Sequence, residues 1–153
     1  MTPQLTFSIR LNNDLLITDY QALAIASEKA GFDQFWVSND LFFRSAPVIL
    51  ASVAPLTQRI SLGTCILNPY SIDASEIAMF AASMDELTGN RFNLGIAAGA
   101  RDFLSWVGIE QHTPLSAVRE SVRMIRNLLS GEIAACEGRF LRWSDNSYLR
   151  FPA

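Results

Sequence analysis

Residues 84–98 read Met-Asp-Glu-Leu-Thr-Gly-Asn-Arg-Phe-Asn-Leu-Gly-Ile-Ala-Ala, and this stretch joins the end of a helix to the start of a strand. The predicted helix begins at Asp73, a good N-cap, and ends at Gly89, because glycine readily adopts the left-handed conformation that follows a helix. An apolar run of strand length follows at residues 92–98. A helix that leads directly into a buried strand predicts one βα repeat.

The same alternation extends outward over most of the chain. Apolar runs of strand length occupy residues 5–11, 32–38, 60–67 and 92–98. Helical segments are predicted at residues 19–30, from Pro47 to a stop or kink at Pro55, at 73–89 and at 113–131. Thr18 and Gln21 form a possible capping box for the first helix. The fourth helix presents one apolar stripe of Leu115, Val118, Val122, Ile125 and Leu129. Four βα units predict an α/β protein with a parallel sheet.

The repeats allow two architectures, a doubly wound sheet or part of a barrel. A doubly wound nucleotide fold usually carries G-x-G-x-x-G between strand and helix, and Gly95 to Gly99 has the wrong spacing. A barrel needs eight units, and this chain has four. We expect a single domain over residues 1–153, with four βα units at 1–131 and an arm at 132–153 that is either a small hairpin, with Gly138 near its turn, or irregular.

The composition narrows the possible function classes. Hydrophobic residues make up 50% of the 153 residues, which is enough apolar surface for a core. The net charge is −3 and the basic residues are dispersed, so a nucleic-acid surface is not expected. No apolar run could span a membrane and the start lacks a signal-peptide pattern, so we expect a cytoplasmic protein. Cys65, Cys136 and His112 are too few for a zinc site or a histidine triad.

Four segments at the carboxyl ends of the predicted strands are candidate site segments, because ligands bind there in both parallel architectures. They are residues 10–13, 38–44, 66–70 and 97–102. In the second, Asn39 and Asp40 could hydrogen-bond the edge of a flat heterocycle. The alternative is that Asp40 pairs with Arg44 and that the aromatic residues Phe42 and Phe43 are core.

The third and fourth segments also allow two interpretations each. Gly63 and the pair Asn68-Pro69 indicate either a bulge beside a ligand or an ordinary strand that ends at a proline. The small residues around Gly99 could expose backbone amides to a phosphate, with Arg101 adding charge. The alternative there is a tight turn with a surface arginine.

Three blocks, at residues 30–38, 57–70 and 84–96, together resemble the bacterial luciferase-like superfamily of flavin- and deazaflavin-dependent oxidoreductases. The branch that they resemble most is that of methylenetetrahydromethanopterin reductase. Residues 131–152 resemble the insertion arm that precedes the fifth strand in this family. The resemblance therefore implies the N-terminal half of a (β/α)8 TIM barrel, with four βα units and an insertion arm.

The same resemblance implies FMN or the deazaflavin coenzyme F420 at the C-terminal mouth, with hydride transfer or oxygen activation on a small-molecule substrate. It implies catalytic positions at Asn39 and Asp40 and no metal. It implies a non-prolyl cis peptide at Cys65–Ile66. Together with the candidate segments, it gives as expected cofactor contacts Asn39, Cys65, Ile66, Asn68, Ala98, Gly99 and Arg101.

The sequence departs from the family pattern at several positions. Asn39 stands where an acid is commoner, and no histidine follows it. Ile72-Asp73-Ala74 stands where many members have Arg-His-Pro. The sequence also ends where a fifth strand would begin. A half-barrel would leave two sheet edges and an open concave face, so we expect a homodimer or larger assembly, formed by pairing two halves or through the outer faces of the second and third helices. The alternative function is a catalytically incomplete half-barrel that acts as a self-associating module.

Overall fold

A four-stranded parallel sheet, in the order β1-β2-β3-β4, is the centre of the computed structural model, which describes residues 5–153. Its strands are β1 (Ser8–Leu11), β2 (Gln34–Val37), β3 (Ser61–Thr64) and β4 (Phe92–Asn93). Each strand pairs with the next in sequence. The predicted order and direction of the four strands are confirmed.

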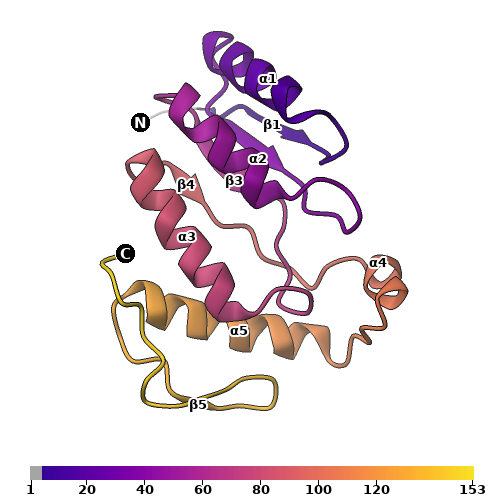
Figure 1. The fold of residues 1–153 in the computed structure, drawn as a ribbon, viewed down its shortest axis with the longest axis vertical. Helices are drawn as coiled ribbons and strands as arrows, with labels where there is room; N and C mark the ends of the chain where they lie inside the picture. The colour runs from indigo at the N-terminus through magenta and orange to yellow at the C-terminus, as the bar shows by residue number, and fades with distance from the viewer. Residues whose placement is uncertain (1–4) are drawn as a thin grey trace.

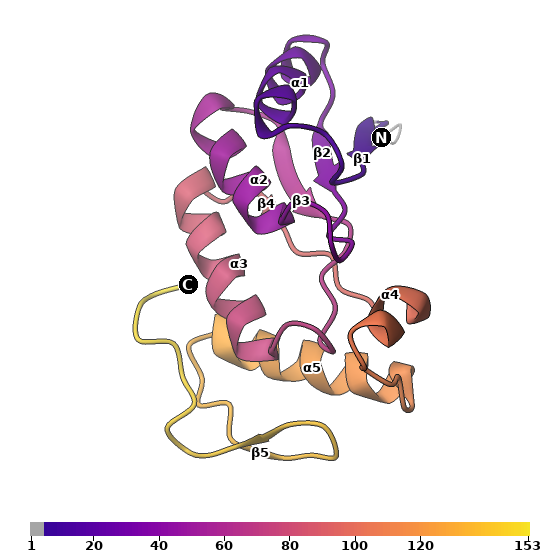
Figure 2. The same cartoon turned by 45° about the vertical axis from the view of Figure 1, so that its right-hand side comes forward.

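Helices α1 (Ile17–Lys29), α2 (Ala46–Val53) and α3 (Ala74–Thr88) lie on one side of this sheet, and the short η1 (Ala54–Leu56) continues α2 (Figures 1 and 2). They cover the outward side chains of the strands, and the buried core between them includes Tyr20, Phe35, Ile49, Leu50 and Leu62. The predicted ends of α3 are confirmed. The Asp73 carboxylate accepts a hydrogen bond from Ser75 N at 2.8 Å, and Gly89 is left-handed with φ 63°.

Beyond β4 the chain forms α4 (Arg101–Trp106) and α5 (Pro114–Leu129), and α5 crosses the end of α3 (Figure 1). A second core fills the space between α3 and α5 and includes Ile77, Met124 and Leu128. The predicted hairpin is confirmed as β5 (Cys136–Glu137) paired antiparallel with β6 (Arg142–Trp143). The Glu120 carboxylate of α5 ties this hairpin down by accepting a hydrogen bond from Leu141 N at 2.9 Å. None of the helices in residues 5–153 is long and apolar enough to cross a membrane.

Two local predictions about helices are wrong, and one short helix was not predicted. Helix α1 starts before Thr18, with Leu16 as N-cap, because the Asp19 carboxylate accepts a hydrogen bond from Leu16 N at 3.3 Å and takes the capping role. Helix α4 was not predicted, since its six residues are too few to show a helical period. The buried face of α5 is rotated from the predicted stripe: Leu115 is 72% exposed, and the buried residues are Ala117, Ser121, Met124, Ile125 and Leu128.

Strand β4 is shorter than predicted because the β3 backbone leaves the regular ladder beside it. The Thr64 hydroxyl takes over the pairing: it donates to Gly95 O at 3.1 Å and accepts from Gly95 N at 3.0 Å. A Cβ on residue 95 would lie 2.1 Å from Thr64 O, so only glycine fits this close approach. The ladder resumes with a single bridge between Leu67 and Ile96. At the opposite end of β4, the Arg91 guanidinium donates to the carbonyls of Ile60, Thr57 and Thr88 and ties β4 to the start of β3.

The open face of the sheet carries mostly polar side chains. Register partners in parallel strands point to the same side, and Arg10, Trp36, Gly63 and Asn93 form one such row. The row two positions earlier lies on the same face and contains Ser8, Gln34 and Ser61, which are all at least partly exposed. Exposed apolar side chains occur instead on the outer helices, with Val48 54%, Met79 45% and Leu87 51% exposed.

Candidate functional site

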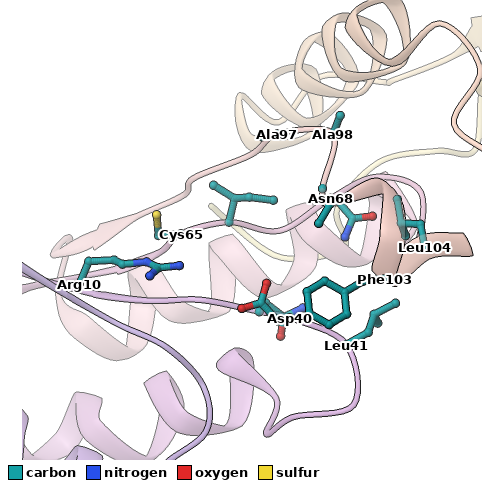
Figure 3. A pocket seen from close by; sticks show the side chains of 13 residues that line it. Arg10, Asp40, Leu41, Cys65, Asn68, Ala97, Ala98, Phe103 and Leu104 are labelled. Carbon is teal, nitrogen blue, oxygen red and sulfur yellow. The ribbon is translucent and has the colours of Figure 1, made fainter. Parts of the chain in front are cut away.

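A cavity of about 470 Å³ lies at the carboxyl ends of the four strands, where the sequence places the candidate segments (Figure 3). Arg10 is its only basic lining residue and Asp40 its only acidic one. In Figure 3, Arg10 and Cys65 lie at one end, Phe103 and Leu104 lie at the other, and Asp40 is between them. The lining residues are Arg10, Asn39, Asp40, Leu41, Cys65, Ile66, Asn68, Ala97, Ala98, Gly99, Ala100, Phe103 and Leu104.

The cavity brings together most of the residues that the sequence analysis selected. Those that line it are Asn39, Asp40, Cys65, Ile66, Asn68, Ala98 and Gly99. Arg101 is not among the lining residues; it is exposed at the first turn of α4. The Cys65–Ile66 peptide bond is cis, as the resemblance implied. The roles of these residues stay predictions.

The loop that carries Asn39 and Asp40 is held in place by Asn13, which lies in the first candidate segment (residues 10–13) but was given no specific role. Asn13 is 1% exposed, and its Nδ2 donates to Asp40 O at 2.9 Å and to Arg44 O at 2.7 Å. Its Oδ1 accepts from Asp40 N at 3.3 Å. The Asn39 Oδ1 accepts from Ala46 N at 3.0 Å and so caps the first turn of α2, which leaves the Asn39 Nδ2 as the donor of that side chain.

The alternative interpretation of this loop, in which Asp40 pairs with Arg44 and two aromatic residues belong to the core, is not found in residues 5–153. Arg44 forms no ion pair with Asp40, since its guanidinium donates to Asp14 O at 2.7 Å. Phe42 and Phe43 are 69% and 55% exposed and do not belong to the core. The ring of Phe42 lies 6.2 Å from that of Trp106 on α4, so exposed aromatic side chains stand beside the cavity mouth.

Asn68 fixes the turn after β3. Its Oδ1 accepts hydrogen bonds from Tyr70 N at 3.2 Å, Ser71 N at 2.9 Å and the Ser71 hydroxyl at 3.1 Å. Asn68 is 5% exposed, and its side chain also lies against Gly99. Burial raises the pKa of the Tyr70 hydroxyl, which donates to His112 O at 2.8 Å. This turn therefore links the end of β3 to the loop after β4 and to the segment before α5.

The loop at residues 97–100 fits the phosphate of a flavin-type cofactor. Its side chains are no larger than alanine, and Gly99 has φ 81°, a conformation that L side chains rarely adopt. A Cβ on Gly99 would lie 3.0 to 3.1 Å from Asn68 side-chain atoms, so the loop backbone approaches the cavity closely. In residues 5–153 no protein acceptor pairs with the N–H of Gly99 or of Ala100. Free backbone N–H groups beside a cavity are suited to bind an oxyanion.

Comparison with known proteins adds the family to this geometry. The sequence model of the luciferase-like monooxygenase family matches residues 12–152. The chain belongs to this family. A curated relative, 5,10-methylenetetrahydromethanopterin reductase of Methanolobus tindarius, is 33% identical over 129 residues, which are 84% of this chain and 39% of the relative. An F420-dependent glucose-6-phosphate dehydrogenase of Kineococcus radiotolerans is 32% identical over 134 residues, 80% of this chain and 40% of the relative. The chain thus spans less than half the length of these family members.

Solved structures of two oxidoreductases share the fold. The coenzyme F420-dependent tetrahydromethanopterin reductase of Methanopyrus kandleri superposes with a TM-score of 0.89 over 96% of this chain and 46% of its own, at 24% identity. The oxygenating constituent of the 3,6-diketocamphane monooxygenase of Pseudomonas putida, solved with FMN, superposes with a TM-score of 0.79 over 89% of this chain and 42% of its own, at 16% identity. The luciferase-like chain therefore has the fold of one half of a (β/α)8 barrel.

Proposed function

We propose that this chain carries the cofactor-binding part of a flavin- or deazaflavin-dependent oxidoreductase. The observation that supports this most is the cavity at the strand ends, where the small loop at residues 97–100 closes on Asn68. The relatives named as F420-dependent enzymes and the neighbour solved with FMN are similar over most of this chain. FMN and coenzyme F420 are both candidates, and the substrate is a small molecule. The cytoplasmic location stays a prediction.

In this proposal each lining segment has a separate task. The N–H groups of Gly99 and Ala100 bind the phosphate. The backbone at Cys65 and Ile66 lies against the flat ring, and the Asn39 Nδ2 donates a hydrogen bond to the ring edge. Arg101 adds positive charge from outside the cavity. When bound, the ring supplies hydride transfer or oxygen activation.

Asp40 and Arg10 then act on the substrate side. The Asp40 carboxylate is the acidic group of the lining, and in this proposal it accepts a hydrogen bond or a proton from the substrate. The Arg10 guanidinium donates to Asn12 Oδ1 at 2.8 Å and forms no ion pair within residues 5–153, which leaves most of its donors for a ligand. A substrate with a carboxylate on an apolar body matches the Arg10 charge and the aromatic Phe103.

Equilibrium titration with FMN and with coenzyme F420, followed by absorbance and fluorescence, tests the proposal. We expect saturable binding of at least one of them with a stoichiometry of one per chain. Asn68→Asp keeps the oxygen that holds the turn but replaces the amide with a negative charge, so it should weaken binding about tenfold or more without unfolding the chain. Asn146→Asp, on the exposed arm, carries the same charge change and should leave the affinity unchanged. Absence of saturable binding of both compounds to the wild-type chain would refute the proposal.

The second candidate is a self-associating module, and the exposed apolar side chains of the outer helices favour it. Val48 on α2 and Met79 and Leu87 on α3 are all about half exposed, and strands β1 and β4 each lack one neighbour. We propose a homodimer or larger assembly through these helices. Sedimentation equilibrium should give a mass above the 17.0 kDa of one chain, and Val48→Glu should lower it. A wild-type chain that sediments as a folded monomer at micromolar concentration would refute the association.

A further inference from the structure

Gln111, in the segment between α4 and α5, reaches back to the loop after β4. Its Nε2 donates to Ala98 O at 2.6 Å and to Gly99 O at 3.1 Å. A glutamine amide nitrogen carries two hydrogens, so these two contacts use its full donor capacity. One side chain from a distant segment thus holds two successive carbonyl groups of the small loop.

This hold determines where the loop's N–H groups point. The peptide bonds on both sides of Gly99 are trans, since the only cis bond in residues 5–153 is Cys65–Ile66. In a trans peptide the C=O and the N–H point in opposite directions. The Ala98 carbonyl shares its peptide with Gly99 N–H, and the Gly99 carbonyl shares its peptide with Ala100 N–H. Both N–H groups therefore point away from Gln111, and they belong to residues that line the cavity. Neighbouring backbone N–H groups that point the same way are suited to bind an anion.

The segment that carries Gln111 is itself anchored. The next residue, His112, accepts the hydrogen bond of the Tyr70 hydroxyl at 2.8 Å. Tyr70 belongs to the turn that Asn68 fixes, and the Asn68 side chain lies against Gly99. The contacts form a closed ring from Asn68 through Tyr70, His112 and Gln111 back to Gly99. Gln111 is therefore held on a fixed frame.

We propose that Gln111 is a positioning residue that aims the N–H groups of Gly99 and Ala100 at the phosphate of the cofactor. This inference rests on the proposed function, and it adds a residue outside the cavity lining. Gln111 does not touch the phosphate. Its loss leaves the ring contacts at Cys65 and Ile66 in place, so the effect is confined to the phosphate end.

Gln111→Met tests this, because methionine keeps the length of the side chain and removes the donors. We measure the dissociation constants of FMN and of riboflavin, which lacks the phosphate, by flavin fluorescence. We expect the variant to lose about tenfold in FMN affinity, as two loop carbonyls lose their donor and the N–H groups lose their fixed direction. Riboflavin affinity should change less than about twofold. Gln58→Met, at an exposed site near the opposite end of β3, is the matched control and should change neither value.

Equal losses of affinity for FMN and riboflavin would mean that Gln111 only supports the fold. An unchanged FMN affinity would mean that Gln111 does not position the phosphate-binding loop. Either result overturns the inference. Inorganic phosphate gives a readout that needs no flavin. In NMR titrations phosphate should shift the amide signals of Gly99 and Ala100 saturably, and Gln111→Met should weaken this binding. If neither FMN nor coenzyme F420 binds but this phosphate response holds, the proposed function fails and the positioning role stands. Absence of the response in the wild-type chain overturns the role.

Discussion

Replacement of Asn13 by alanine should loosen the loop that carries Asp40, and the structure gives the size of the effect. The substitution removes two hydrogen bonds donated to Asp40 O and Arg44 O and one accepted from Asp40 N. At about 0.5 to 1.5 kcal/mol for each bond, the loss is roughly 2 to 4 kcal/mol. Water cannot easily replace the lost partner, because Asn13 is 1% exposed. The loss is a large part of the free energy of unfolding of an ordinary domain.

Urea denaturation followed by circular dichroism measures this loss. With a slope of about 2 kcal/mol per molar urea, the midpoint of Asn13→Ala should fall by roughly 1 to 2 M. Asn13→Asp keeps the acceptor for Asp40 N but sets a carboxylate against two carbonyl oxygens. It should be destabilised near neutral pH and recover part of the loss as the pH falls, because burial against two carbonyl oxygens favours the protonated acid, which can donate again.

The matched control is Asn146→Ala, an exposed asparagine on the arm, whose midpoint should change little. Equal midpoints for Asn13→Ala and Asn146→Ala would refute the role of Asn13 as the clamp of the Asp40 loop. A pH-independent loss in Asn13→Asp would show that the donated bonds are not the source of the effect.

Three further predictions concern single charged residues. Burial acts to raise the pKa of Glu28, but backbone N–H donors from Ile60, Arg59 and Gln58 and the charge of Arg59 outweigh it and lower the pKa below 4.5. The ionised Glu28 carboxylate therefore stabilises the fold above pH 4.5, and this contribution is lost as the pH falls through the lowered pKa. The difference in unfolding free energy between wild type and Glu28→Gln, measured by urea melts, should shrink on acidification. Arg91→Lys should cost about 1 to 3 kcal/mol in the same assay, because an ammonium group cannot reproduce the planar contacts to three carbonyls; an unchanged midpoint would contradict this. Arg10→Met should weaken benzoate binding by about tenfold in NMR titrations and leave FMN affinity unchanged, whereas Arg139→Met should affect neither; a parallel loss of FMN binding would assign Arg10 to the cofactor instead.

The spacing of apolar residues and the residues that cap helices made most of the fold predictable. The four apolar runs gave the strands, and Asp73 with Gly89 gave the ends of α3, because caps act within a few residues of the chain. The rotation of α5 was not predictable from its apolar stripe, since the face that shares a core with α3 is made of Met124, Ile125 and Leu128, and Leu115 stays exposed. Short helices such as α4 have too few residues to show a period.

The position of the site was predictable, but the residues that hold its loops were not. Parallel strands bring their carboxyl ends to one edge, so Asp40, Asn68 and Gly99 were expected to meet, and they line one cavity. Asn13 lies 27 residues from Asp40, and Gln111 lies 13 residues from Ala98. No local sequence pattern predicts hydrogen bonds between segments so far apart, so these residues became visible only when the loops were placed together.

The central claim is that a flavin-type cofactor binds at the strand ends, and mapping bound FMN and bound coenzyme F420 by NMR tests it most directly. On separate addition of the two compounds to the 15N-labelled chain, we expect at least one to cause saturable amide shifts confined to the cavity loops at residues 39–41, 65–68 and 97–104. Shifts confined instead to the apolar hollow between α3 and the arm, lined by Met79, Trp143 and Phe151, or no saturable shifts at all, would contradict it.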